Sequence, residues 1–300
     1  MMKKKMVIAG GTGFLGNLLS IYFKSEYNIY ILTRNQLAKN HVKWDAKTEG
    51  SWGKVMEDID VLINLTGKSV DCRYHEKNKK LIHNSRIQST RVLNEVCSKL
   101  KNPPKVWINS SSATIYNESY KDKRTEKDKV EPKNFSQNVC IKWEKEFNKI
   151  QIPNTRKVIV RTSIVFGKKG GAYIPLKRLV RFGFGGKQGP GIQMVSWLHE
   201  LDFCRAIQFI IENQINDAVN LCSPNPVMNK DFMRSLRESL DIVGYLNLPS
   251  WKLEIGASII RTETEMILKS RYVYPEKLIE KGFEFKYDKI GECLNNLAKK

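Results

Sequence analysis

Apolar and polar residues alternate in two distinct ways along the first two-thirds of the chain. Short runs that are continuously apolar and mostly β-branched are typical of strands buried on both faces. We expect such strands at "KMVIA", "NIYILT", "DVLINL", "KVWINSS" and "KVIVRTS". Between them, apolar positions recur at the spacing of amphipathic helices, at about 14–24, 76–100 and 135–150. This strand–helix–strand order predicts an α/β fold with a doubly wound parallel sheet and right-handed crossovers.

The pattern changes after Ser163, where the chain becomes rich in glycine and basic residues. An amphipathic helix, "LDFCRAIQFIIEN", and a short strand, "AVNLCS", follow this stretch. We expect residues 1–166, rejoined by 194–224, to form one domain. Residues 167–193 and 225–300 are expected to form a smaller, mainly helical substrate lobe. This lobe would cover the carboxyl ends of the strands, where open α/β sheets bind ligands.

Three glycines mark the turn between the first expected strand and the first expected helix. Gly10 allows a tight turn, Gly13 a close approach of the backbone to a pyrophosphate, and Gly16 close packing of the helix on the sheet. Phosphates bind at the free N–H groups and the positive end of such a helix. The alternative is a turn of purely structural value. We expect a Rossmann-type dinucleotide site formed here by Gly10, Thr12, Gly13, Phe14, Leu15 and Gly16.

The end of the second strand predicts which dinucleotide binds. An acid there would accept hydrogen bonds from the adenosine ribose of NAD, but "YILTRNQ" places Arg34 at that point. A guanidinium fits a 2′-phosphate bidentately, so we expect NADP rather than NAD. Alternatively, Arg34 is an ordinary surface cation or stacks on the adenine without selecting the cofactor. The ends of two further strands are expected to line the cofactor with Leu65, Thr66, Gly67 and Ser110.

Several motifs in a fixed order resemble a known family. "GGTGFLG" and "SSSATIY" resemble the extended short-chain dehydrogenase/reductase family, which contains sugar-nucleotide epimerases and dehydratases. "NLTGKSVDCRY", "NSRIQSTRVL", "VCIKWEKEF" and "VSWLHELDFCRAI" are more closely similar to an atypical NAD(P)-dependent epimerase-like subfamily with its own small C-terminal domain. The likeness extends over nearly the whole chain, through "PEKLIEKGFEFKY". It implies a Rossmann-type sheet, a bound dinucleotide and a small-molecule substrate that the motifs do not identify.

The resemblance also implies catalytic residues, of which only some are present. Ser112 matches the serine that follows the fifth strand. The family's Tyr-x-x-x-Lys, in which the lysine lowers the pKa of a proton-donating tyrosine, is replaced by Ser136 and Cys140. Tyr116 is the first candidate for another acid, with an aromatic packed under the loop as its alternative. Otherwise Ser112 and a substrate group transfer the proton, or the nucleotide binds without turnover.

These observations lead to two hypotheses for function. The first is an NADP-dependent oxidoreductase or nucleotide-sugar-epimerase-like enzyme that acts on a small carbonyl or hydroxyl compound. The second is an NADP(H)-binding sensor or scaffold without turnover, because the tyrosine–lysine pair is missing.

Three further residues match family positions. Arg86 stands where the wider family often has asparagine. We expect it to bind the cofactor, although it could instead contact a substrate anion or form an ion pair on the helix surface. Arg161 matches a strand-end arginine of the family, and His199 matches a position near the substrate cleft; a structural role is expected for both. We also expect Asp202 to cap or orient the helix that follows it.

Composition and charge narrow the classes of partner and site. The six cysteines lack zinc-finger spacing, so we expect buried reduced thiols and no metal site. The formal charge is +20, but the lysines are interleaved with acids, which favours a solvated surface over a specific nucleic-acid face. No apolar run approaches the ~20 residues that span a bilayer. We therefore expect a cytoplasmic protein that does not bind membranes, and the family resemblance implies a monomer or homodimer.

Overall fold

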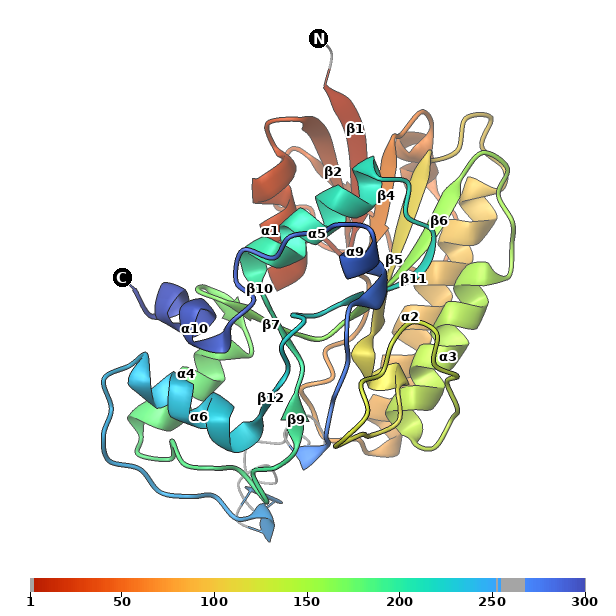
Figure 1. The fold of residues 1–300 in the computed structure, drawn as a ribbon. Helices are drawn as coiled ribbons and strands as arrows, with labels where there is room; N and C mark the ends of the chain where they lie inside the picture. Colours follow the sequence, from red (N-terminus) through yellow and green to blue (C-terminus); the bar gives the residue numbers. More distant parts are fainter. Residues whose placement is uncertain (1–2, 252, 255–267, 300) are drawn as a thin grey trace.

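A seven-stranded parallel sheet forms the centre of the computed structural model, which describes residues 3–251, 253–254 and 268–299. The strand order is β11-β6-β5-β4-β1-β2-β3, so the chain winds outward in both directions from β1 (Figure 1). This order confirms the predicted doubly wound Rossmann-type fold. The strands are β1 (Lys4–Ala9), β2 (Tyr27–Thr33), β3 (His41–Lys43), β4 (Val61–Asn64), β5 (Val106–Ser112), β6 (Arg156–Thr162) and β11 (Asp217–Leu221).

Helices cover both faces of the sheet (Figure 1). Successive side chains of a strand point to opposite faces, so Met6 and Ile8 pack in one core while Val7 and Ala9 pack in the other. This two-sided burial explains why the strands are continuously apolar. One face carries α1 (Phe14–Phe23), α5 (Glu200–Glu212) and α9 (Glu276–Glu280), and the other carries α2 (Glu76–Cys97) and α3 (Phe135–Asn148). Two short 3₁₀ helices are η1 (Ser51–Met56) and η2 (Ala113–Ile115).

A second, smaller lobe lies beside the carboxyl ends of the strands, at the lower left of Figure 1. Its core gathers Trp197, Phe232 and Leu294, among others, all of them buried. The rings of Phe166 and Phe232 stack there with their centroids 5.3 Å apart. The helices are α4 (Tyr173–Arg181), α6 (Asn229–Glu238) and α10 (Ile290–Ala298). The short strands are β7 (Ile164–Gly167), β8 (Gly170–Gly171), β9 (Met194–Val195), β10 (Trp197–His199) and β12 (Val227–Met228).

The C-terminal part of the chain does not stay in this lobe. Leu278 and Phe283 are buried in the core between the sheet and α1 and α5, and Val273 packs in a separate cluster with Tyr116. The expectation that all of 225–300 forms the lobe is therefore wrong for the segment around α9. Its apolar residues fit either core, and sequence spacing alone does not distinguish the two.

Two polar residues at the start of α5 hold the lobe and the sheet together. His199 is the N-cap of α5: its Nδ1 accepts a hydrogen bond from the Leu201 N–H at 3.0 Å, and its Nε2 lies 3.1 Å from Oδ1 of Asn296. Asp202 is fully buried and accepts the backbone N–H groups of Lys286 and Tyr287 at 2.9 and 2.8 Å. His199 is thus structural, and Asp202 anchors the C-terminal segment rather than capping the helix.

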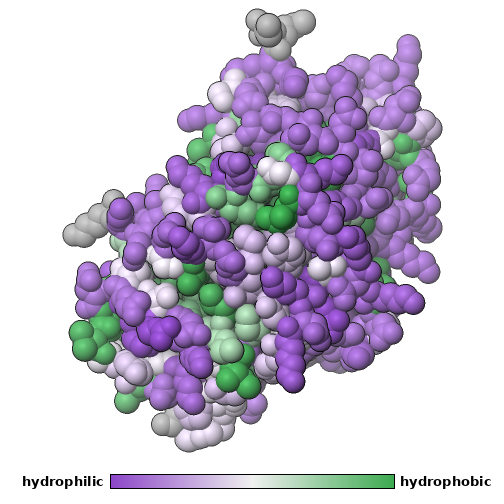
Figure 2. Space-filling view, viewed as in Figure 1, coloured by the Kyte–Doolittle hydropathy of each residue, from purple (hydrophilic) through white to green (hydrophobic). Residues whose placement is uncertain are grey.

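The surface seen in Figure 2 is mostly hydrophilic, with small and separate apolar groups. Within the described ranges, no helix combines the length and the hydrophobicity that a membrane crossing requires. Five of the six cysteines are buried, and all six are free thiols, as expected. Burial raises the pKa of Cys97 and of Cys204 to about 12, so these thiols are inert at neutral pH.

Candidate functional site

The glycine turn after β1 has the geometry of a phosphate site. Gly10 has φ +73°, and a Cβ on it would lie 3.0 Å from the backbone of Thr66. A Cβ on Gly16 would overlap the backbone of Gly11, so only glycine lets α1 pack this closely. Gly13 is the N-cap of α1, and no side chain caps the helix or places an acid in its first turn. The first N–H groups of α1 therefore have no side-chain acceptor among the described residues and suit an anion.

The neighbouring strands extend this site on both sides. β1 lies between β2 and β4, so the turn is flanked by Arg34 at one strand end and by Thr66 at the other. The Thr66 Oγ1 atom is buried and has no hydrogen-bond partner within the described chain. An unpaired buried hydroxyl is costly unless a ligand satisfies it. The residues around the turn therefore fit a bound dinucleotide.

The side chains of the glycine-turn residues divide between the site and the packing. Thr12 and Gly13 are exposed at the turn, whereas Leu15 packs against the core of the sheet. The Phe14 ring instead fills a notch in the second lobe, where a Cβ on any of three glycines of that lobe would overlap it. Only the backbone of Phe14 remains at the phosphate site. The three glycines are Gly167, Gly170 and Gly171, which accounts for part of the glycine-rich stretch.

Arg34 lines a surface pocket of about 580 Å³ together with Lys43 and Trp44. Lys43 ends β3 and pairs in register with Thr33, so the two cations stand at the ends of adjacent strands. Asp45 also lines this pocket, but its carboxylate accepts the N–H groups of its own loop. Sequence reasoning missed Lys43, because β3 has only three residues and gives no periodic signal.

The loop after β4 is shaped by buried polar contacts. Asn64 is fully buried, and its amide donates to Oδ1 of Asn109 at 2.8 Å while its Oδ1 accepts the Thr66 N–H at 3.1 Å. The backbone N–H of Leu65 donates to the carbonyl of Ala9. These contacts fix the predicted cofactor residues of this loop beside the glycine turn.

Arg86 reaches from α2 to the same loop. A Cβ on Gly67 would lie 3.1 Å from Cζ of Arg86, and Nη1 of Arg86 donates to the carbonyls of Lys68 and Ile82 at 3.1 and 3.0 Å. The guanidinium lies over the Trp143 ring, 5.2 Å from its centroid. No carboxylate of the described residues pairs with it, so the ion-pair alternative is wrong. Burial lowers the pKa of Arg86, since desolvation disfavours the charged form.

The three serines that end β5 face in alternate directions, as strand geometry requires. Ser111 points inward, and its hydroxyl donates to Glu144 at 2.7 Å. Ser112 is half-buried, and its Oγ accepts the Thr114 N–H at 3.2 Å and caps η2. Within the described part of the chain, the Ser110 hydroxyl makes only a long contact of 3.5 Å to the carbonyl of Ser111. Ser110 and Ser112 thus stay on the predicted cleft side, whereas Ser111 belongs to the interior.

Tyr116 does not face the cleft. It is 1% exposed, its hydroxyl donates to Oδ1 of Asn220 at 2.8 Å, and the same oxygen accepts from Nη1 of Arg161 at 2.8 Å. Arg161 in turn binds Glu144 bidentately, at 3.0 and 2.8 Å. Burial raises the pKa of Tyr116 to about 12, although Arg161 opposes the shift. The prediction of Tyr116 as the alternative acid is therefore wrong: the ring is packed, and its hydroxyl is satisfied.

The two positions of the missing tyrosine–lysine pair lie on α3. Cys140 is buried, and burial raises the pKa of its thiol to about 12. The charge of Arg86 is the strongest of those that oppose this rise. Ser136 is half-buried at the start of the same helix. A thiol with this pKa does not supply the charge of a lysine.

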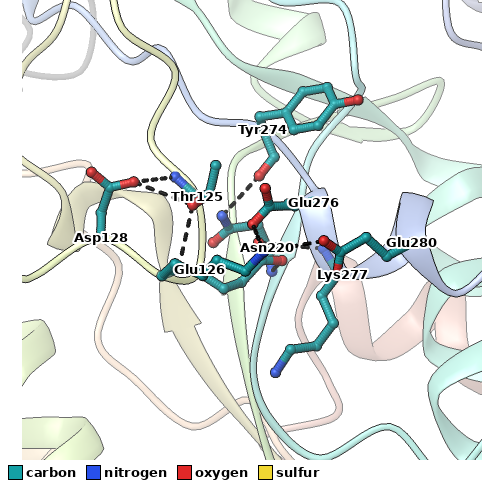
Figure 3. A network of polar contacts seen from close by, with 9 residues as sticks. Thr125, Glu126, Asp128, Asn220, Tyr274, Glu276, Lys277 and Glu280 are labelled. Atoms are coloured by element: carbon teal, nitrogen blue, oxygen red, sulfur yellow. Dashed lines mark hydrogen bonds and ion pairs between the residues drawn. The ribbon is translucent and has the colours of Figure 1, made fainter.

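A network of hydrogen bonds and ion pairs connects β11 to the loop after η2 and to the segment around α9 (Figure 3). The Glu126 carboxylate accepts the backbone N–H of Asn220 at 2.8 Å, and the Asn220 side chain donates to the carbonyl of Tyr274 at 3.0 Å. Lys127 forms ion pairs with Glu276 and Glu280 at 3.0 and 3.1 Å. These contacts bind the loop after η2 to the segment around α9. No sequence signal pointed to this docking, because the partners are about 150 residues apart.

Comparisons with known proteins agree with this geometry. The sequence model described as NAD dependent epimerase/dehydratase family matches residues 6–222, and a model described as Domain of unknown function (DUF1731) matches 248–297. Epimerase family protein YfhF of Bacillus subtilis (strain 168) is 33% identical over 301 residues, covering 97% of this chain and 97% of that protein. Epimerase family protein SAR0825 of Staphylococcus aureus (strain MRSA252) is 32% identical over 305 residues, covering 99% and 100% respectively.

Solved structures share the fold at lower identity. Human epimerase family protein SDR39U1 (isoform 2), solved with NADPH, superposes with a TM-score of 0.87 at 24% identity, over 98% of this chain and 99% of that chain. UDP-N-acetylglucosamine 4-epimerase from Methanobrevibacter ruminantium M1, solved with UDP-N-acetylmuramic acid, superposes with a TM-score of 0.79 at 18% identity, over 99% and 98%. At these identities the likeness establishes the fold alone.

Proposed function

Because the chain belongs to the NAD dependent epimerase/dehydratase family, we propose that it is an NADP-dependent oxidoreductase or epimerase-like enzyme acting on a small carbonyl or hydroxyl compound. The observation that carries the choice of cofactor is the pair of cations, Arg34 and Lys43, at the ends of adjacent strands beside the glycine turn. The NADPH bound to the human relative gives this choice further support.

Each part of the site has a separate task in this proposal. The first N–H groups of α1 bind the diphosphate, and Arg34 and Lys43 bind the 2′-phosphate. The buried Thr66 hydroxyl hydrogen-bonds the cofactor and is thereby satisfied. When bound, the cofactor supplies or accepts the hydride. Ser112 lies at the end of β5 and orients the reacting oxygen of the substrate.

The experiment is a titration with NADPH and with NADH, followed by the fluorescence of the reduced nicotinamide. We expect Arg34→Ala to weaken NADPH binding by about 10- to 100-fold, since a hydrogen bond to a charged group contributes about 1.5–3 kcal/mol. Binding of NADH should change little. Lys43→Ala should act in the same direction, whereas Lys39→Ala removes an exposed cation outside the pocket and serves as the control. Equal loss of both cofactors in Arg34→Ala would contradict the assignment of NADP.

A second function, cofactor binding without turnover, is favoured by one observation. Ser136 and Cys140 replace the tyrosine and lysine, and the nearby phenol of Tyr116 is sealed in the interior. Assays of NADPH oxidation with a panel of aldehydes and ketones separate the two functions. Turnover that falls in Ser112→Ala would support the enzyme and exclude the sensor. Tight binding of NADPH with no oxidation of it would favour the sensor.

A further inference from the structure

We propose that Arg86 binds a carboxylate or phosphate group of the substrate, so that the substrate is an anionic carbonyl or hydroxyl compound. This inference rests on the proposed function, because it assumes that the cofactor lies along the ends of β1, β2 and β4. It adds a class of substrate and a residue that recognises it.

The first support is the incomplete set of partners around the guanidinium. Arg86 has five N–H donors, and only Nη1 is used, by the carbonyls of Lys68 and Ile82. Nε and Nη2 donate to no acceptor of the described chain, and neither nitrogen is sealed from solvent. The two free groups form one edge of the planar fork, which is the geometry that binds a carboxylate or phosphate.

The second support is the balance of charge around Arg86. Among the described residues, its guanidinium contacts two carbonyl groups and the Trp143 ring and forms no ion pair. Glu144 follows Trp143 on α3, but its carboxylate is held by Nε and Nη2 of Arg161 and by the Ser111 hydroxyl. It therefore does not neutralise Arg86. A partly desolvated cation without a counterion is costly, and an anionic ligand removes that cost.

The third support is the position of Arg86 relative to the proposed cofactor. The phosphates of NADP are assigned to α1 and to Arg34 and Lys43, which lie at the ends of β1, β2 and β3. Arg86 lies at the end of β4, beside Gly67 and next to the β5 strand that carries Ser112. The nicotinamide and its ribose carry no negative charge. The anion that Arg86 suits is therefore one that the substrate brings.

The test uses two simple probes, sodium phosphate and sodium acetate, on the full chain saturated with NADPH. Binding is measured by isothermal titration calorimetry at constant ionic strength kept with sodium chloride. We expect Arg86→Gln to weaken binding of the preferred probe by about tenfold or more, and Arg86→Lys by less, since lysine keeps the charge but not the fork. Arg91→Gln is the matched control, because Arg91 lies on the same helix but is half-exposed and paired with Glu146.

The outcomes are distinct. Arg86-dependent binding of phosphate supports a phosphorylated substrate, and Arg86-dependent binding of acetate supports a carboxylic acid. Absence of binding in the wild type, or equal binding in Arg86→Gln, would overturn the proposal. Loss of NADPH affinity in an Arg86→Gln protein with a normal melting temperature would also overturn it, because Arg86 would then serve the cofactor. If the wild type binds no NADPH, the proposed function fails, and probe titration without cofactor still reads the dependence on Arg86.

Discussion

Two arginines that contact neighbouring residues of α3 have contrasting surroundings: Arg86 lies over the Trp143 ring, and Arg161 binds Glu144. Arg161 is 7% exposed and donates to Glu144 twice and to Tyr116 once. Burial alone would lower the pKa of Arg161, but the ion pair with Glu144 raises it well above its usual range. No carboxylate of the described residues pairs with Arg86, and burial lowers the pKa of its guanidinium. The arginine at the end of β6 thus has a carboxylate partner, whereas the arginine near the end of β4 has none among the described residues.

This difference distinguishes an arginine that stabilises the fold from one that is available to a ligand. Folding favours complete networks, because a half-satisfied buried polar group costs more than an apolar one. In the closed network of Glu144, Arg161, Tyr116 and Asn220, the members pair with one another, so no ligand is needed to satisfy them. Arg86 and the Thr66 hydroxyl, by contrast, keep polar groups without a hydrogen-bond partner among the described residues, which a ligand would satisfy.

The largest effect is expected from breaking the closed network. Arg161→Met leaves Glu144 as an uncompensated buried charge and should lower the free energy of unfolding by about 3–5 kcal/mol. Arg86→Gln should cost about 1 kcal/mol or less, because it removes no counterion. Urea unfolding followed by circular dichroism measures both. Adding Glu144→Leu to Arg161→Met should recover part of the loss, and similar costs for Arg161→Met and Arg86→Gln would refute the contrast.

A smaller effect is expected at the two hydroxyl groups that were predicted as catalytic. Tyr116→Phe leaves an Arg161 N–H and the Asn220 oxygen unpaired and should destabilise the protein by about 1–3 kcal/mol. Its turnover per folded molecule, and the pH profile of that turnover, should not change. Ser112→Ala should reduce turnover while costing about 1 kcal/mol for the lost cap of η2. A changed pH profile in Tyr116→Phe would restore Tyr116 as the acid.

The smallest effect concerns the pH dependence of stability. Burial lowers the pKa of His199 below its ordinary value of 6.5, and protonation of Nδ1 would remove the acceptor for the Leu201 N–H. Between the two pKa values, His199 is therefore protonated in the unfolded chain and neutral in the folded chain. The contribution of His199 to stability should fall as the pH drops below about 6.5, with a slope of less than about 1.4 kcal/mol per pH unit, and should be constant above it.

The measurement is urea unfolding between pH 7.5 and pH 5, compared in variants of two N-cap histidines. His199→Asn keeps a capping oxygen and should flatten the slope. His75→Asn is the control, since His75 caps α2 through the Asn78 N–H but is exposed, so water solvates it in both states. An unchanged slope in His199→Asn would show that another group titrates.

Much of the fold was predictable from the sequence, because its signals are local. The apolar runs placed six of the seven strands of the sheet, and the helical spacing placed α1, α2, α3 and α5. β3 was not predicted, because three residues are too few to show a period. The packing of Leu278 and Phe283 against the sheet was not predicted either, because both cores accept the same apolar residues. The predicted domain boundary failed there for that reason.

The candidate site divides in the same way. Local sequence signals were enough to predict the glycine turn, where a Cβ on Gly10 or Gly16 would meet backbone, and to place Arg34 at the end of β2. The burial and pairing of other residues depend on the tertiary structure: the Phe14 ring packs in the second lobe, Tyr116 is buried and bonded to Arg161, and Arg86 lies over Trp143 without a carboxylate partner among the described residues. The physical reason is that a turn is fixed by neighbouring residues, whereas burial and charge balance depend on which distant strands and helices meet.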